Sequence, residues 1–320
     1  MSFSSEIKRE ICLVETPGRE AKLAELAAMT ENSADIRLCP SGIRIQTENA
    51  MAIARLAELM RDVFYITIEV RGRYGLHGSK ARSYEGVFAD RDAVFDVLGE
   101  IGFLRGDDET PYVEREPDPT LLETMESKRA YLRGAFLCCG SCTAPKKKPH
   151  FEMVCRSEAF AKRLQALMEE FDIHPRILER RRESARPAWV VYLKKNSEIS
   201  DALNVIGAHK ALLNFEEVQV ERDFRNLLNR QVNFEAANLN KTARAALKVN
   251  TDINYLIETK HFSELAPALQ EIAGLRLENP FLSLEDLGEL LDPPLGKSGV
   301  NHRLKKISEI ADEYRGTSAQ

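Results

Sequence analysis

Two short segments carry residues whose types and spacing could do chemistry. The first, GKSGVNHRLKKISEI, runs from Gly296 to Ile310 in a chain of formal net charge -5. It holds four bases, one histidine and one asparagine before its first acid, Glu309. Asparagine can pair with adenine and arginine with guanine through two hydrogen bonds each, and lysine neutralises phosphate. This composition suits contact with duplex DNA.

The second segment is rich in cysteine. Cys139 and Cys142 have CxxC spacing beside Cys138, and this spacing suits zinc or redox chemistry. A zinc site needs a second pair of ligands, and only His150 and Cys155 follow nearby. Packing of reduced thiols is the favoured interpretation, with metal binding or redox chemistry as the alternative. We predict no metal and no cofactor.

The elements around the basic segment fit a helix-turn-helix. Pro293 and Pro294 should end one helix, Gly296 permits a sharp turn, and Ser298 is expected to cap the next helix. Apolar residues recur at helical spacing on both sides of this turn, at Leu284, Leu287, Leu290 and Leu291, and at Val300, Leu304, Ile307 and Ile310.

If the second helix buries its apolar side chains, its polar and basic ones stay on the other faces. Lys297 and Ser298 would lie at the helix N-terminus, where backbone N–H groups suit a phosphate. The alternative is a solvated basic face on a packing helix. The candidate DNA-binding residues are Lys297, Ser298, Asn301, His302, Arg303, Lys305 and Lys306.

The first two-thirds of the chain repeats itself at an offset of 105 to 108 residues. RLAELM at 55–60 returns as RLQALM at 163–168, and VFDVLGEIG at 94–102 returns as ISDALNVIG at 199–207. Both copies show the order αββαββα, so we predict an α+β duplicated domain followed by an all-α domain. Asn49 and Ser157 are expected to cap the second helix of each copy. The predicted segments are a first repeat at 1–102, a linker at 103–126, a second repeat at 127–212 and a helical domain at 213–320 with the helix-turn-helix at about 283–315.

Two further groups of residues could contact DNA. The stretch 128–195 has 16 basic and 7 acidic residues, and in it Arg176, Arg180 and Arg182 alternate along a predicted strand. They form either a phosphate-contacting surface or, as we favour, a solvated edge or a patch facing the acidic linker. The stretch 229–241 has an unusual density of amides, which either cap breaks between helices or contact DNA. Its candidates are Arg230, Asn233, Asn238, Asn240 and Lys241.

Three strings in this order resemble the WhiA family of bacterial sporulation and cell-division regulators. They are IQTENAMAIAR at 45–55, NRQVNFEAANLNKTARAA at 229–246 and KSGVNHRLKKISEIAD at 297–312. The likeness runs from about Met1 to Arg315. It implies a domain like that of LAGLIDADG homing endonucleases followed by a helix-turn-helix, which agrees with the order of elements predicted above.

The same resemblance bears on catalysis. Nucleases of this fold carry an acid near the end of each LAGLIDADG helix to hold a divalent metal, which needs hard oxygen ligands. Ser33 and Cys139 stand at these two lost catalytic-acid positions. Glu31 lies two residues early, about 200° around the helix, and is expected to point away. We therefore predict no enzymatic activity.

The leading hypothesis is a sequence-specific DNA-binding transcription regulator linked to sporulation and cell division. The alternative is a DNA-associated factor in cell division and chromosome segregation with little promoter specificity. Double-stranded DNA is the expected partner, and another regulatory protein is a further candidate partner for the LAGLIDADG-like domain. The internal duplication favours a monomer. No signal peptide or apolar run of about 18 residues occurs, so we expect a cytoplasmic, nucleoid-associated protein without membrane contact.

Overall fold

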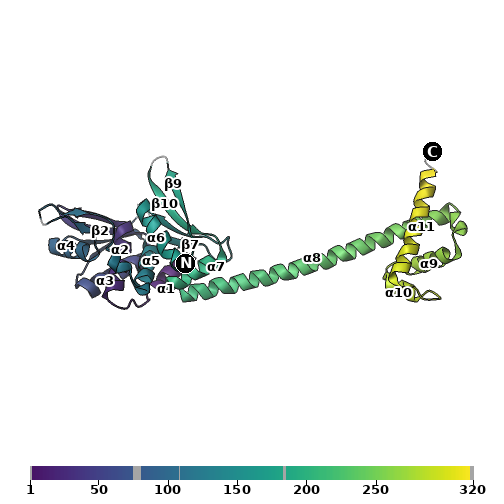
Figure 1. Ribbon diagram of the computed structural model, residues 1–320, viewed down its shortest axis with the longest axis horizontal. Helices are drawn as coiled ribbons and strands as arrows, with labels where there is room; N and C mark the ends of the chain where they lie inside the picture. Colours follow the sequence, from purple (N-terminus) through teal and green to yellow (C-terminus); the bar gives the residue numbers. More distant parts are fainter. Residues whose placement is uncertain (1, 75–80, 108, 183–184, 318–320) are drawn as a thin grey trace. The chain divides into compact units, whose positions relative to one another are not determined.

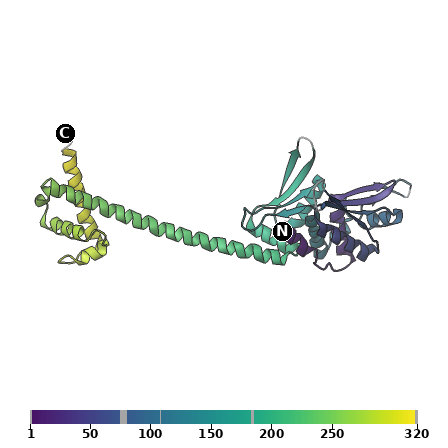
Figure 2. The same cartoon turned by 180° about the vertical axis from the view of Figure 1, so that it is seen from behind.

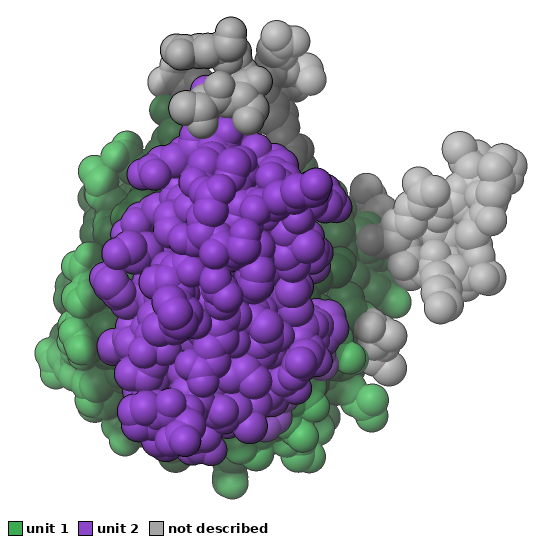
Figure 3. Space-filling view, turned by 90° about the vertical axis from the view of Figure 1, so that its right-hand side faces the viewer, with its two compact units in different colours: residues 1–222 green, residues 223–320 purple. Residues whose placement is uncertain are grey.

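A computed structural model describes residues 2–74, 81–107, 109–182 and 185–317, apart from side chains next to the gaps. It divides into two compact units, Met1–Arg222 and Asp223–Gln320, coloured separately in Figure 3. The boundary falls inside one continuous helix, α8 (His209–Glu258), which contributes to both units. Each unit has a hydrophobic core of its own.

The first unit contains the duplicated domain, so the predicted α+β fold with two αββαββα copies is confirmed (Figure 1). The first copy consists of α2 (Arg19–Ser33), β1 (Ala34–Leu38), β2 (Ser41–Thr47), α3 (Ala50–Phe64), β3 (Glu69–Tyr74), β4 (Ala81–Phe88) and α4 (Arg91–Glu100). The second consists of α5 (Met125–Cys139), β7 (Gly140–Cys142), β8 (Phe151–Cys155), α6 (Glu158–Glu169), β9 (Arg176–Arg182), β10 (Ala185–Leu193) and α7 (Asn196–Val205).

Each copy builds an antiparallel four-stranded sheet with the same strand order. The orders are β1-β2-β4-β3 and β7-β8-β10-β9. In the second sheet Met153 pairs with Gly140 on one side and with Val191 on the other. Because side chains alternate along a strand, Phe151, Met153 and Cys155 face the core together and are buried. The residues between them face the other side of the sheet.

The two copies meet through α2 and α5, which pack against each other. A Cβ atom at Gly134 of α5 would lie 2.4 Å from the backbone oxygen of Glu25 in α2, so only glycine permits this approach. The predicted helix caps at Asn49 and Ser157 are confirmed, because their side chains accept hydrogen bonds from the N–H groups of Met51 and Phe160. These caps start α3 and α6, the second helix of each copy.

Several short elements were not predicted. Helix α1 (Phe3–Ile11) precedes the first copy and buries Phe3, Ile7 and Ile11. The predicted linker contains β5 (Leu104–Arg105), β6 (Tyr112–Val113) and the 3-10 helix η1 (Pro119–Leu122). Figure 2 shows the two sheets and their helices from behind.

The second unit is entirely helical in its described part. After α8 come the 3-10 helix η2 (His261–Glu264), α9 (Pro267–Glu278), α10 (Leu284–Glu289) and α11 (Lys297–Thr317). As predicted, Val300, Leu304 and Ile307 of α11 are buried in its core, which the end of α8 completes with Ile253 and Leu256. None of the helices in the described ranges has both the length and the apolar character to cross a membrane.

The turn between α10 and α11 requires a glycine in α10. A Cβ atom at Gly288 would lie 1.9 Å from the backbone oxygen of Leu295 and 3.0 Å from Val300. Gly288→Ala should therefore lower the free energy of unfolding of the second unit by about 1–3 kcal/mol, the usual cost of overpacking. Chemical denaturation followed by circular dichroism measures this, with Gly316→Ala as the control because nothing lies near that position. Equal stability of the two variants would show that the turn can move.

Candidate nucleic-acid interface

Helix α11 is the best-placed candidate for contact with DNA. It begins at Lys297, and the oxygen of Gly296 accepts hydrogen bonds from the N–H groups of Gly299 and Val300. The predicted capping role of Ser298 is therefore wrong, because Ser298 lies inside the helix and Gly296 occupies the capping position. The first turn of α11 still carries Lys297 and Ser298, both exposed.

The buried side chains of α11 leave a polar face free. With ~100° per residue, Ser298, His302, Lys305 and Lys306 lie on the side opposite Val300 and Leu304, and Asn301 lies at one edge of that side. All five of these residues are exposed. Arg303 is half-buried at the edge of this face, and its Nη1 lies 3.4 Å from the backbone oxygen of Ala268 in α9. The α9 carbonyl thus holds Arg303 toward the protein.

The two lysines on this face have acidic neighbours. Lys305 Nζ lies 3.5 Å from a carboxylate oxygen of Glu309, one turn further on. Lys306 lines a groove that also contains Glu264 and Glu313. Asn301 and His302 are exposed between these lysines and the helix start, which makes them the residues best suited to reach base edges.

That groove was not predicted from the sequence. Two contacts between residues that line it hold η2 against α11. The His261 ring stacks on the Tyr314 ring at 3.8 Å between centroids, and the Tyr314 hydroxyl donates to Glu264 Oε2 at 2.7 Å. Hydrogen bonds from Tyr314 and His261 hold the pKa of Glu264 below its usual value. The contact joins residues about fifty positions apart, which helical periodicity in a single sequence does not reveal.

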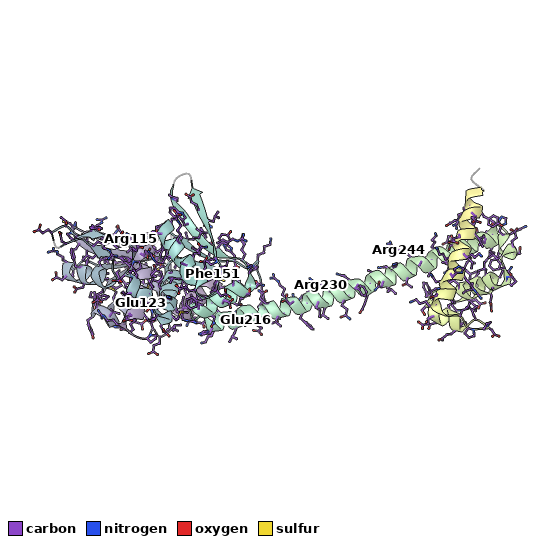
Figure 4. All side chains as sticks on the ribbon, viewed as in Figure 1. Arg115, Glu123, Phe151, Glu216, Arg230 and Arg244 are labelled. Atoms are coloured by element: carbon purple, nitrogen blue, oxygen red, sulfur yellow. The ribbon has the colours of Figure 1, made fainter. Side chains whose placement is uncertain are left out.

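Helix α8 carries the second group of candidates. It runs through 229–241 without a break, so the interpretation of these amides as caps between helices is wrong. By helical periodicity Arg230, Asn233, Asn240 and Lys241 lie within an arc of about 100°, and Asn238 lies outside it. Asn226, Asn229, Arg244 and Lys248 extend the same face. All of these side chains are exposed, and Arg230 and Arg244 can be followed in Figure 4.

The third group lies on β9. Arg176 and Arg180 occupy the same side of the strand, opposite the core-facing Ile177, whereas the side chain of Arg182 lies outside the described part. Arg180 Nη2 is 3.4 Å from Glu152 Oε2. Burial opposes ionisation of Glu152, but the hydrogen bond from His150 and the charge of Arg180 outweigh it and lower its pKa. Glu152 thus provides Arg180 with a countercharge inside the sheet.

The two positions predicted to have lost a catalytic acid lie at the ends of the packed helices α2 and α5. Ser33 is buried at the last residue of α2, and Cys139 ends α5 with its Sγ 3.1 Å from the backbone oxygen of Ala135. Burial raises the pKa of Cys138 and Cys142 to about 12. Metal binding and redox chemistry use the thiolate, so these environments favour the packing interpretation of the cysteines.

Cations surround the end of α2. Arg115 Nη1 donates to the backbone oxygen of Glu31 at 3.1 Å, and Arg156 Nη1 lies 3.5 Å from that of Ala34. Burial and the charge of Arg156 lower the pKa of Arg115. The Glu31 carboxylate is itself bound by Tyr131 and Arg163. The end of α2 therefore lies among positive charges, and the Glu31 carboxylate is bound inside the protein.

A second buried network was not predicted. The Glu25 carboxylate of α2 accepts hydrogen bonds from Arg55 Nε at 2.9 Å and from the Thr16 hydroxyl at 2.8 Å, and lies 3.5 Å from Arg133 Nε of α5. Arg55 and Arg163 hold equivalent positions in the two copies, at the RLAELM and RLQALM strings, and each binds a glutamate of α2. The duplicated arginines therefore hold α3 and α6 against the central helix pair.

Comparison with known proteins finds two family domains along the chain. The WhiA LAGLIDADG-like domain matches residues 128–225, and the WhiA C-terminal HTH domain matches residues 228–311. The chain is 39% identical over 323 residues to the probable cell division protein WhiA of Thermoanaerobacter sp. (strain X514), covering all of both chains. It is 37% identical to the corresponding protein of Clostridium beijerinckii, covering 98% of this chain and 99% of the relative.

A solved structure has the same fold. Full-length WhiA from Thermatoga maritima matches with a TM-score of 0.56 and 24% identity, covering 98% of this chain and 99% of that one. The identity to the curated relatives extends over essentially the whole length, and the two domain matches follow in the order seen in the structure. The chain therefore belongs to the WhiA family.

Proposed function

We propose that this protein is a sequence-specific DNA-binding transcription regulator linked to sporulation and cell division. The observation that carries the proposal is α11, which buries its apolar side in a helix-turn-helix and presents Asn301, His302 and Lys305 to solvent. A helix of this kind enters the major groove, where amide and imidazole groups can read base edges. The exposed lysines suit the phosphates on either side.

A second candidate function is supported by the names of the relatives, which describe probable cell division proteins. Under this proposal the protein acts in cell division and chromosome segregation and binds DNA with little promoter specificity. Genome-wide occupancy distinguishes the two. Discrete sites upstream of genes support the regulator, whereas broad occupancy without enrichment at promoters supports the second function.

We further propose that the LAGLIDADG-like domain does not cleave DNA. Metal-assisted cleavage needs hard oxygen ligands, whereas Ser33 and Cys139 stand at the helix ends and Arg115 and Arg156 add positive charge there. The purified chain should leave supercoiled plasmid intact in the presence of Mg²⁺ or Mn²⁺. Nicking that increases with metal and persists through purification would contradict this. The domain instead offers Arg176 and Arg180 for phosphate contact, or a surface for another regulatory protein.

The proposed place of action is the cytoplasm, at the nucleoid. Fluorescence microscopy of the tagged full chain should show it with the DNA. The Asn301→Ala/Lys305→Ala double variant should spread through the cell if α11 supplies most of the attachment.

A further inference from the structure

One exposed side of α8 between residues 226 and 248 carries bases and amides without a single acid. At ~100° per residue its members fall within an arc of about 100°, and all of them are exposed. It lies wholly within the second unit, which begins at Asp223. Figure 4 labels two of its arginines, Arg230 and Arg244. This basic face consists of Asn226, Arg230, Asn233, Ala237, Asn240, Lys241, Arg244 and Lys248.

The basic face lowers the stability of the helix that carries it. Asparagine has a lower helix propensity than alanine, and the face contains three asparagines. Lys241, Arg244 and Lys248 follow one another at spacings of three and four residues, where like charges repel. Of the four bases, only Lys248 has an acidic partner within the described ranges, since its Nζ lies 3.5 Å from Asp312 Oδ2. An anion bound along the face would relieve the repulsion.

The composition of the basic face suits a nucleic acid better than a protein. Protein–protein interfaces are enriched in aromatic residues and depleted in lysine, whereas protein–DNA interfaces are more polar and much more positively charged. Ala237 is the one apolar member of the face, which has no aromatic or large aliphatic side chain. Arginine and lysine neutralise phosphate, and asparagine amides donate hydrogen bonds to phosphate oxygens.

The end of the basic face is held beside α11. Arg315 of α11 donates to the buried carboxylate of Asp252 at 2.7 Å, and its Cζ lies 4.6 Å from the centre of the Tyr255 ring. Asp312 of α11 lies 2.9 Å from Arg315 Nη1 and 3.5 Å from Lys248 Nζ. The last turns of α8 and the second half of α11, which lie side by side in Figure 1, are therefore joined by ion pairs within the second unit.

This contact falls on the Asn301 side of α11. By helical periodicity Asp312 lies about 20° around α11 from Asn301 and about 16 Å along its axis. A helix-turn-helix contacts base edges with the N-terminal residues of its second helix. Lys248, beside Asp312, therefore lies away from the bases that Asn301 would contact, at a place suited to a backbone phosphate.

We propose that the basic face of α8 binds the phosphate backbone of the same DNA that α11 reads. The inference rests on the proposed DNA binding by α11 and adds a second, sequence-independent contact to it. From Arg230 to Lys248 the face is about 27 Å long at ~1.5 Å per residue, which equals the length of about eight base pairs. It raises the affinity for any duplex and leaves the preference among sequences to α11.

Removal of three bases tests the phosphate contacts. In the full chain, Arg230→Ala/Lys241→Ala/Arg244→Ala should reduce the slope of log affinity against log salt by about 2.7. The advantage of the unmodified chain should accordingly shrink about 40-fold between 50 and 200 mM salt, for the preferred site and for unrelated DNA alike. The charge-retaining variant Arg230→Lys/Lys241→Arg/Arg244→Lys should behave like the unmodified chain. Fluorescence anisotropy measures the affinities, and circular dichroism verifies that α8 stays helical.

An isosteric pair of substitutions tests the face itself. Asn240→Asp adds a negative charge on the basic face, whereas Asn238→Asp adds the same charge on the other side of the helix. Asn240→Asp should weaken the affinity for unrelated DNA about threefold at low salt, the effect of one like charge ~6 Å from a phosphate in water. Asn238→Asp should leave this affinity unchanged. Equal effects of the two substitutions would overturn the assignment to this face.

Failure of this inference differs from failure of the proposed function. If Arg230→Ala/Lys241→Ala/Arg244→Ala left affinity and salt slope unchanged while Asn301→Ala/His302→Ala lost discrimination between sequences, the α8 contact would be overturned and reading by α11 would stand. If the triple variant weakened binding as expected but the unmodified chain preferred no sequence, the α8 contact would stand and sequence-specific reading would fail. A full chain that binds no duplex at low salt would overturn both.

Discussion

Replacing Glu25 with alanine should lower the free energy of unfolding of the first unit by about 3–5 kcal/mol, because it leaves charges buried without their partner. Glu25 is fully buried, and Arg55 and Arg133 are each 5% exposed. Besides its two bonds to Arg55, at 2.9 Å and 3.0 Å, the carboxylate holds Thr16. Burial already lowers the pKa of Arg133, which shows how little solvent compensates that charge.

The measurement can be confined to the first unit. Trp189 in β10 is the only tryptophan in the chain, so its fluorescence during urea denaturation reports on this unit. The control is Glu20→Ala, an exposed acid near the start of the same helix, which should change the free energy by less than about 0.5 kcal/mol. A loss below about 1 kcal/mol for Glu25→Ala would mean that water reaches the arginines and replaces the carboxylate.

The double variant Asn301→Ala/His302→Ala should weaken binding to a preferred DNA site by about 2–6 kcal/mol, at about 1–3 kcal/mol for each base contact. Both side chains are exposed on α11 and neither contributes to the core of the second unit, so the fold should survive. Fluorescence anisotropy at fixed salt gives the affinity for the preferred site and for unrelated DNA. Affinity for unrelated DNA should change little, because phosphate contacts dominate it.

Lys305→Ala is the matched control from the same face. It should weaken binding to both DNAs alike and reduce the slope of log affinity against log salt by about one. The carboxylate of Glu309, 3.5 Å away, would make this effect smaller if the pair persists on DNA. If the double variant instead lost affinity equally for all sequences, Asn301 and His302 would be phosphate contacts and another element would read the bases.

Local signals predicted much of the fold. The repeated strings place Arg55 and Arg163 at equivalent positions, and the structure gives each copy the same order of helices and strands. Side-chain capping at Asn49 and Ser157 depends on residues two or three positions away, so single residues sufficed to predict it. The same is true of the buried positions Val300, Leu304 and Ile307, which follow from helical spacing alone.

Features that depend on distant partners could not be predicted. The Glu25 network joins residues up to 117 positions apart, since Arg133 also donates to Thr16.

Helix boundaries were also predicted incompletely. Helix ends vary by a residue or two, and the start of α11 at Lys297 excluded Ser298 as a cap. One of the two interpretations of the amides in 229–241 placed breaks between helices there, because asparagine has low helix propensity, but the alanines and long side chains of 229–246 sustain α8.

Selection of bound sequences from random duplex DNA, with the full chain and its Asn301→Ala variant in parallel, tests directly whether α11 reads bases. The unmodified chain should enrich one motif, with an adenine at a position that the variant no longer distinguishes, because an asparagine amide pairs with adenine in the major groove. If both proteins enriched the same motif with the same preference at every position, Asn301 would not read DNA. If neither enriched any motif, sequence-specific recognition by this helix would be contradicted.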